Sequence, residues 1–349
     1  MTPIRSRHCL CVVLAGVAAL RGDLTFGDDF PPPNGFAWTT GAALVAPQAV
    51  DGDQKYSIKD PSVVFADGKW RLFCTVRGRD RSHGVVYLEF EDWDQAGAAP
   101  QRMLTMHAGF FCAPQVFYFR PHGKWYLVCQ ASDPSWSPEY QPAFSTTDDV
   151  GDPESWAPLA PMFGRKPDVN AWLDFWVICD EDRAHLFFTS LDGKMYRSST
   201  SFDAFPLGWS DPVVALEGDV FEASHTYRLK DRDEYLTVIE AQGNNPWRYF
   251  KAYTAKQLDG PWTPLESGEA RWFATTRNVL QTDDHWTDSI SHGELLRAGF
   301  DERLEVDSSD FRVVFQGVLE EDREGKVYGE IPWRLGLLEE ASPQPLGND

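Results

Sequence analysis

Three acidic residues, Asp60, Asp174 and Glu222, each begin a short apolar segment, and they lie far apart in the chain. Acids that gather in one partly desolvated place repel one another, so the pKa of at least one rises while another stays ionised. Hydrolysis of a glycosidic bond needs such a pair: one carboxylic acid protonates the leaving oxygen and one carboxylate activates water. A single acid of this kind is more often a strand-end residue, but three in equivalent places favour catalysis.

The neighbours of the three acids suggest different tasks. Lys59 places an ammonium group beside Asp60, which favours the ionised carboxylate that a general base requires. Glu222 stands between two apolar residues, a setting that favours the protonated form of a general acid. Asp174 lies in an aromatic segment with no charged residue beside it, so we expect it to tune the pKa of the acid and to hold the sugar ring.

The elements that position these acids recur along the chain as a unit of two apolar strands joined by a charged turn. Copies begin at Asp60, Ala113, Asp174 and Glu222, and a fainter fifth begins near Ser289. The first two copies are the most alike, because each continues through Gly-Lys-Trp into a second apolar strand. The period of roughly 50 to 70 residues is typical of repeated blades.

Five such units, with no helical periodicity between them, predict an all-β fold, a five-bladed β-propeller. The innermost strands of a propeller converge on one axis, so residues at equivalent positions in different blades become neighbours. We therefore expect Asp60, Asp174 and Glu222 to meet at one mouth of the central channel. A two-sheet sandwich is the rival architecture, but it does not predict the same polar residue at the same place in successive units.

Composition and charge narrow the class of partner. The 349 residues include 14 Trp and carry a formal charge of -21, which repels nucleic acid and anionic membrane surfaces but not a neutral polysaccharide. The flat face of a sugar ring stacks well on an indole, although most of these rings are expected simply to fill the core.

The N-terminus reads as a secretion signal. Arg5 and Arg7 precede the apolar run Leu10–Leu20, which is short for a membrane span. We expect residues 1–22 to be removed on export and residues 23–349 to form a single catalytic domain, secreted and monomeric.

Four cysteines stand outside this leader, each in an apolar strand-like segment where a buried thiol and a disulfide are equally expected. They are Cys74, Cys112, Cys129 and Cys179.

The motifs around the acids resemble glycoside hydrolase family 62, the α-L-arabinofuranosidases that act on arabinoxylan and related polymers. The similar segments run in the family's order from about Phe36 to Leu338, nearly the whole of the expected mature chain. They are residues 57–64 (SIKDPSVV), 113–119, 124–128, 174–180, 221–224, 291–294, 297–301 and 332–338.

The resemblance implies a five-bladed propeller that releases arabinofuranose with inversion at the anomeric carbon. It implies Asp60 as general base, Glu222 as general acid and Asp174 as the residue that tunes the pKa of the acid. Lys59 and Tyr328 match positions near the arabinose; their plainer interpretations are a surface lysine and a loop tyrosine.

His292 matches the histidine that, in related enzymes, holds a calcium ion in the channel; a histidine that binds only water is the alternative. No cofactor is expected to be required for the chemistry. Two departures from the family pattern, Phe300 in place of the usual tyrosine and the loop 243–248, bear on which plant cell-wall polysaccharide, arabinoxylan or arabinan, is preferred.

Two other functions stay open at this point. One is a related propeller glycosidase of different specificity, such as an exo-acting xylosidase or an arabinanase. The other is a non-catalytic propeller that binds sugar in the same place, although binding alone does not need a graded set of carboxylates.

Overall fold

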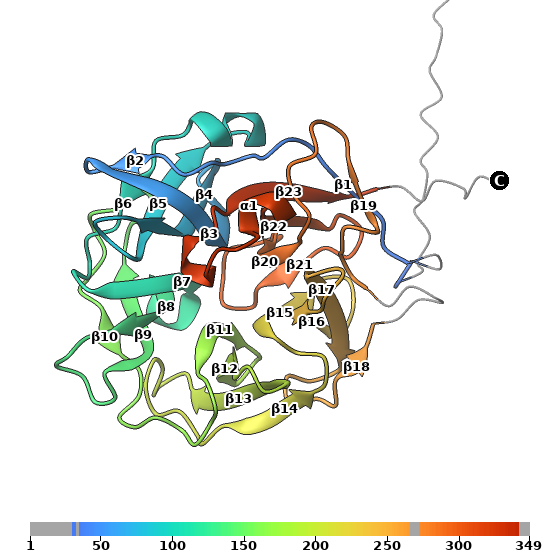
Figure 1. Cartoon of the computed structure of the whole chain (residues 1–349). Coiled ribbons are helices and arrows are strands. Elements are labelled where there is room, and N and C mark those ends of the chain that lie inside the picture. Colours follow the sequence, from blue (N-terminus) through green and yellow to red (C-terminus); the bar gives the residue numbers. More distant parts are fainter. Residues whose placement is uncertain (1–29, 33–34, 266–271, 342–349) are drawn as a thin grey trace, which may run out of the picture.

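The described part of the chain forms five β-sheets around a central axis. The computed structural model describes residues 30–32, 35–265 and 272–341, and the expected leader, residues 1–22, lies outside these ranges. Figure 1 looks along the axis and shows the sheets following one another around it as blades. The predicted five-bladed β-propeller is confirmed.

Blades 1 to 3 follow the order of the sequence. Blade 1 contains β2 (Ala49–Val50), β3 (Asp53–Ala66), β4 (Lys69–Gly78), β5 (Gly84–Phe90) and β6 (Arg102–Met103). Blade 2 contains β7 (Phe110–Phe119), β8 (Lys124–Ser132), β9 (Tyr140–Thr147) and β10 (Ala160–Pro161). Blade 3 contains β11 (Leu173–Cys179), β12 (Arg183–Thr189), β13 (Lys194–Ser201) and β14 (Val213–Glu217).

Blades 4 and 5 draw on distant parts of the chain. Blade 4 contains β15 (Glu222–Leu229), β16 (Tyr235–Gln242), β17 (Arg248–Ala255), β18 (Thr263–Pro264) and the later strand β21 (Glu305–Val306). Blade 5 contains β20 (Ser291–Leu295), β22 (Arg312–Gly317), β23 (Arg334–Glu340), β1 (Trp38–Thr40) and β19 (Val279–Gln281). Because β1 pairs with β23, strands from both ends of the described chain close the ring in one sheet.

One strand of each blade lies next to the axis. β3 lies beside β7 and β20, β11 beside β7 and β15, and β15 beside β20, so the five inner strands form a closed circle. Each pairs with an antiparallel second strand that is almost entirely buried, as the apolar repeat predicted.

The core lies between the blades and is rich in aromatic residues. Trp38, Trp176 and Trp333 are among the largest fully buried side chains, so many indoles do fill space between sheets. The four cysteines outside the leader are buried free thiols. In the described ranges no helix is long and apolar enough to cross a membrane.

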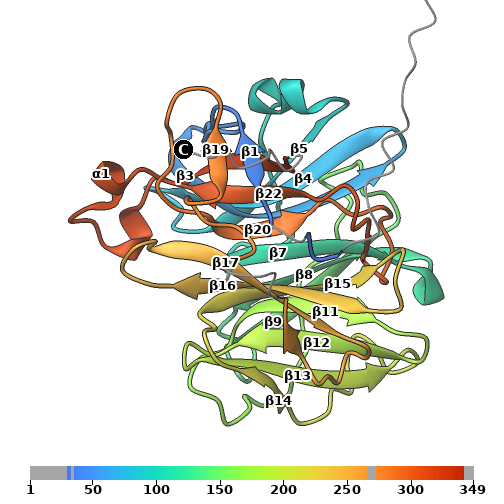
Figure 2. The ribbon, with the colours of Figure 1, turned by 90° about the vertical axis from the view of Figure 1, so that its right-hand side faces the viewer.

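Short helical turns cover one face of the ring. α1 (Glu320–Arg323) and η3 (Tyr328–Glu330) lie in the connection between β22 and β23. Figure 2 shows this connection projecting from the face that points toward the viewer in Figure 1.

Candidate active site

A β-bulge interrupts each of the five inner strands at the same level. The extra residues begin at Asp60, Ala113, Asp174, Ala223 and His292. The first four have left-handed backbones, with φ between 48° and 55°, a conformation that is uncommon for residues other than glycine. A bulge re-aims the side chains beside it, and here it does so at the same level in every blade.

This register corrects one expectation from the sequence. Asp60 and Asp174 are equivalent bulge residues, but the equivalent residue of blade 4 is Ala223, and Glu222 stands one position earlier. Glu222 is therefore the counterpart of Lys59. Lys59 and Asp60 are adjacent in the strand, yet their side chains point to the same place. Nζ of Lys59 lies 3.0 Å from Oδ2 of Asp60. The bulge can in the same way bring Glu222 to the level of the two aspartates.

The bulges are tied to one another by a repeated hydrogen bond. In four of the five steps around the ring, the bulge residue donates its backbone N–H to a side chain on the second strand of the preceding blade. The acceptors occupy equivalent positions, opposite the residue before each bulge; they are Thr75, Gln130, Glu240 and Gln316.

The step from blade 3 to blade 4 is the exception. Its second-strand residue, Thr189, has a buried hydroxyl without a hydrogen-bond partner among the described residues. Instead, Oδ2 of Asp174 accepts the backbone N–H of Ala223 at 3.2 Å. The carboxylate of Asp174 is thereby fixed against the peptide that carries Glu222.

Asp60 is buried and held in its ionised form. Burial alone raises the pKa of a carboxyl group, but the positive charges of Lys59 and His292 outweigh it and hold the pKa of Asp60 below its usual value. Nδ1 of His292 lies 3.5 Å from Oδ1 of Asp60. The prediction that Lys59 favours the ionised carboxylate is in line with this geometry.

Glu222 has a different environment from the one that its neighbours in sequence suggest. The expectation of an apolar setting is wrong, because Nη1 of Arg248 lies 3.2 Å from Oε1 of Glu222. The pKa of Glu222 is nevertheless raised well above its usual value, by burial first and then by the negative charges of Glu240 and Asp174, against the opposing effect of Arg248.

The carboxyl group of Asp174 is also shifted toward its protonated form. Burial raises its pKa, His292 opposes this, and the negative charge of Asp60 adds to it. Asp174 thus interacts electrostatically with both Asp60 and Glu222, so the structure brings the three predicted acids into one site.

Two residues of this site, Glu240 and Arg248, were not predicted from the sequence. Glu240 is fully buried and pairs with Arg248 at 2.7 Å, and it accepts hydrogen bonds from the hydroxyl of Ser291 and the backbone N–H of His292, each at 2.8 Å. The position of Glu240 opposite Glu222 in the strand pair β15–β16 is the feature that could have identified it. Arg248 ends the loop 243–248, which departs from the family pattern.

Lys59 and Tyr328, which the resemblance implied as neighbours of the arabinose, lie side by side. Nζ of Lys59 is 5.3 Å from the ring centroid of Tyr328, and Lys59 is 7% exposed, so it is not a surface lysine. Tyr328, on η3, is 42% exposed and also lies 5.9 Å from the guanidinium carbon of Arg248. An exposed aromatic ring next to buried charges is suited to contact a sugar.

His292 offers a single nitrogen for the expected calcium ion. Calcium takes six to eight oxygen ligands, and the described residues contain no group of three or more His, Cys, Asp or Glu that could hold a metal. The nearby carboxylate of Asp60 is already paired with Lys59. These side chains do not form a calcium site by themselves, and water would have to supply most of the ligands.

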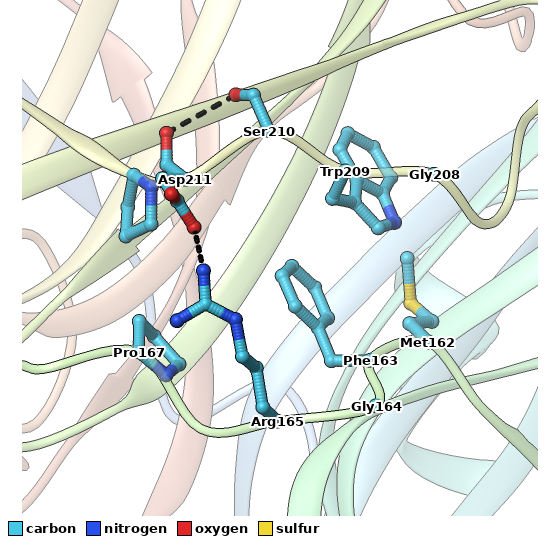
Figure 3. Close-up of a pocket in the computed structure, with 10 residues that line it drawn as sticks. Met162, Phe163, Gly164, Arg165, Pro167, Gly208, Trp209, Ser210 and Asp211 are labelled. Atoms are coloured by element: carbon cyan, nitrogen blue, oxygen red, sulfur yellow. Dashed lines mark hydrogen bonds and ion pairs between the residues drawn. The ribbon is translucent and has the colours of Figure 1, made fainter.

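Phe300 and a surface cavity lie away from the acids. The backbone of Phe300 accepts a hydrogen bond from Tyr118, beyond the bulge on β7, and its ring packs on Trp125. The cavity, of about 380 Å³, lies between the segments after β10 and before β14 (Figure 3). Phe163 and Trp209 stand nearly parallel in it with ring centroids 6.3 Å apart, and none of the predicted site residues lines it.

The chain is similar in sequence to a protein of known name. The curated alpha-L-arabinofuranosidase C of Cellvibrio japonicus (strain Ueda107) is 38% identical over 308 residues, which are 86% of this chain and 46% of that protein. The chain therefore spans about half the length of this relative.

Solved structures resemble the chain along nearly their whole length. The catalytic domain of a Coprinopsis cinerea family 62 α-L-arabinofuranosidase is 36% identical with a TM-score of 0.81, over 88% of this chain and 98% of that one. A family 62 hydrolase in complex with xylotriose is 34% identical with a TM-score of 0.81, over 89% and 99%. Residues 37–339 match the profile of glycosyl hydrolase family 62. The chain, with its three acids on inner strands of a five-bladed propeller, belongs to this family of glycoside hydrolases.

Proposed function

We propose that this protein is a secreted α-L-arabinofuranosidase that removes terminal arabinofuranosyl side groups from arabinoxylan or arabinan with inversion. The observation that carries the proposal is the contrast between two carboxyl groups of one site, the buried Asp60 and the partly buried Glu222. The pKa of Asp60 is lowered and that of Glu222 is raised, which is the division that acid and base catalysis requires.

Asp60 is the general base of this reaction. Its carboxylate is kept ionised by Lys59 and His292 and is 2% exposed, so a water molecule that reaches it is activated in a largely desolvated place. Direct attack by this water on the anomeric carbon inverts its configuration.

Glu222 is the general acid. It stays protonated because burial and the carboxylates of Glu240 and Asp174 disfavour its charge, and it donates its proton to the glycosidic oxygen as the bond breaks. Once Glu222 is ionised, the neighbouring guanidinium of Arg248 stabilises the carboxylate.

The sugar is placed by Asp174, Lys59 and Tyr328. Asp174 is oriented by the backbone of Ala223, and the Tyr328 ring beside Lys59 offers an exposed apolar face. The choice of arabinose rests on the relatives, two of which are named α-L-arabinofuranosidases. Xylotriose in the third related structure is a piece of the xylan backbone, which supports arabinoxylan as the polymer.

His292 is the residue through which a calcium ion would be held. Such an ion would order the channel and take no part in proton transfer, since Asp60 accepts the proton of the water and Glu222 donates a proton to the leaving oxygen.

The proposal is tested by arabinose release from wheat arabinoxylan, arabinan and an aryl arabinofuranoside. Asp60→Asn and Glu222→Gln should each lower the rate about 10²- to 10⁴-fold with unchanged folding by circular dichroism. Release of xylose or of arabino-oligosaccharides instead would favour another propeller glycosidase. Tight polysaccharide binding without turnover by the folded wild type would indicate a sugar-binding protein.

A further inference from the structure

A second groove of about 830 Å³ opens beside the catalytic site, between the end of β4 and the connection that carries η3. Its charged lining residues are Arg77, Arg79 and Lys326, against one acid, Glu330. Three cations facing one carboxylate make a local excess of positive charge in a chain whose formal charge is -21. We call this surface the basic groove.

The cations of the basic groove are not neutralised within the described part of the chain. Arg77, Arg79 and Lys326 take part in no ion pair there, although most of the other described arginines do. The buried Nε of Arg77 has no hydrogen-bond partner among the described residues. Buried donors are usually satisfied, so this Nε–H leaves Arg77 with a donor that a ligand can use.

Arg77 is placed firmly rather than left to swing in solvent. It is half-buried on β4, and a Cβ atom added to Gly329 would lie 2.6 Å from its Nη1, so the guanidinium lies against the bare backbone of η3. The hydroxyl of Tyr56, on the neighbouring strand β3, donates to the carbonyl of Gly329 at 2.9 Å and ties η3 to the same blade. A guanidinium fixed in this way presents a planar pair of donors that suits a carboxylate.

The basic groove adjoins the catalytic site. Val327 and Gly329 line it, and Tyr328 between them stands over Lys59, the partner of Asp60. The pKa of His83 is lowered to about 4 by burial and by the positive charges of Arg77 and Lys59. Both cations therefore lie near the His83 ring. A polymer whose arabinose enters the site would therefore have neighbouring sugars close to the groove.

We propose that the basic groove binds a carboxylate-bearing sugar, a uronic acid, attached to the polysaccharide close to the arabinose that is removed. The inference rests on the proposed function and specifies its substrate: an acidic rather than a neutral arabinoxylan. Arg77 binds the carboxylate through its paired donors, and Arg79 and Lys326 add charge at the exposed rim.

The test compares arabinose release from an arabinoxylan that carries glucuronic acid with release from the same polymer after its carboxyl groups are reduced to alcohols. The wild type should show a kcat/KM about fivefold to tenfold higher on the acidic polymer at low salt. This preference should disappear at 0.5 M NaCl, because salt screens exposed charges.

The double variant Arg79→Gln/Lys326→Gln removes the rim charges but keeps Arg77, so it should weaken this preference, and the ratio of the two kcat/KM values should fall toward one. A matched control, Arg102→Gln/Lys166→Gln, removes the same total charge from exposed residues of β6 and of the segment after β10, and should keep the ratio. Equal rates of the wild type on both polymers, or a preference that is undiminished in Arg79→Gln/Lys326→Gln, would overturn the proposal.

A binding experiment separates failure of the groove from failure of the proposed activity. The Glu222→Gln variant is titrated by calorimetry with xylo-oligosaccharides that carry glucuronic acid and with their carboxyl-reduced forms. Tighter binding of the acidic form, weakened by Arg79→Gln/Lys326→Gln, supports the groove even if no arabinose is released from any substrate. Equal binding of both forms rejects the groove while leaving arabinofuranosidase activity to its own test.

Discussion

The backbone N–H of Ala223 lies 3.2 Å from Oδ2 of Asp174, and this contact breaks the pattern that joins the other blades. In other blades the backbone N–H of the equivalent bulge residue donates to a second-strand side chain, such as that of Gln130 or Gln316. The carboxylate of Asp174 therefore replaces a structural hydrogen bond with one that fixes two predicted catalytic residues relative to each other.

This contact makes a prediction about stability. Asp174→Asn keeps an oxygen that can accept the N–H of Ala223, whereas Asp174→Ala leaves a buried donor unsatisfied, at a cost of roughly 1–3 kcal/mol. The alanine backbone itself is not the difficulty, since Ala113 and Ala223 already adopt the left-handed conformation at equivalent positions. Urea denaturation should show Asp174→Ala to be less stable than Asp174→Asn; equal stabilities would mean that the hydrogen bond contributes nothing.

The pH dependence of kcat/KM should follow the two shifted carboxyl groups. The acidic limb reports Asp60, whose lowered pKa places that limb below the usual range of an aspartate, and the alkaline limb reports Glu222, whose pKa is raised. Glu240→Gln removes a negative charge that raises the pKa of Glu222, so the alkaline limb should move to lower pH.

The control for this shift is Glu339→Gln, the same change on an exposed residue of β23. It should leave both limbs in place. An alkaline limb that stays fixed in Glu240→Gln would show that Glu240 does not tune the acid.

Glu222 should destabilise the folded protein at neutral pH. Because its folded pKa is raised above the usual 4.5, the stability that the protonated group provides is complete below pH 4.5 and is lost as pH rises through the folded pKa. Glu222→Gln cannot ionise, so its melting temperature relative to wild type should increase between pH 4 and pH 7. A constant difference in melting temperature would contradict the raised pKa.

Removal of divalent cations should not abolish catalysis. EDTA is expected to leave the rate of arabinose release unchanged, since Asp60 and Glu222 perform both proton transfers. A fall in melting temperature on chelation, reversed by calcium but not in a His292→Ala variant, would support a bound structural ion. Activity that is lost with EDTA and restored by calcium would refute a purely structural role.

Much of the fold could be predicted from sequence because each blade repeats locally. The apolar second strands and charged turns identify the inner strand pairs of blades 1 to 4 without any long-range information. The fainter fifth unit near Ser289 indicated the inner pair of blade 5, β20 and β22, as well. The outer strands of this blade could not be assembled in this way, because β1 is only three residues long and pairs with β23 at the other end of the chain. A pairing over that separation leaves no local periodicity.

The three acids of the site could be predicted from the sequence, but their strand register and the charged neighbours of Glu222 could not. Asp60 and Asp174 begin equivalent bulges, but Glu222 stands one position before the bulge of its strand, and a bulge has no fixed sequence pattern that would show this. Glu240 and Arg248 reach Glu222 from β16 and β17, so their roles depend on strand register rather than on neighbours in sequence. Sequence neighbours indicated the raised pKa of Glu222 for an incomplete reason, since charged residues surround it as well.

Proton NMR of arabinoxylan during the first minutes of hydrolysis shows whether Asp60 and Glu222 act as base and acid of an inverting arabinofuranosidase. We expect arabinofuranose of the β configuration to appear first from the α-linked side group, before mutarotation, and to be absent with Glu222→Gln. Initial release of the α anomer, or of a sugar other than arabinose, would contradict the account.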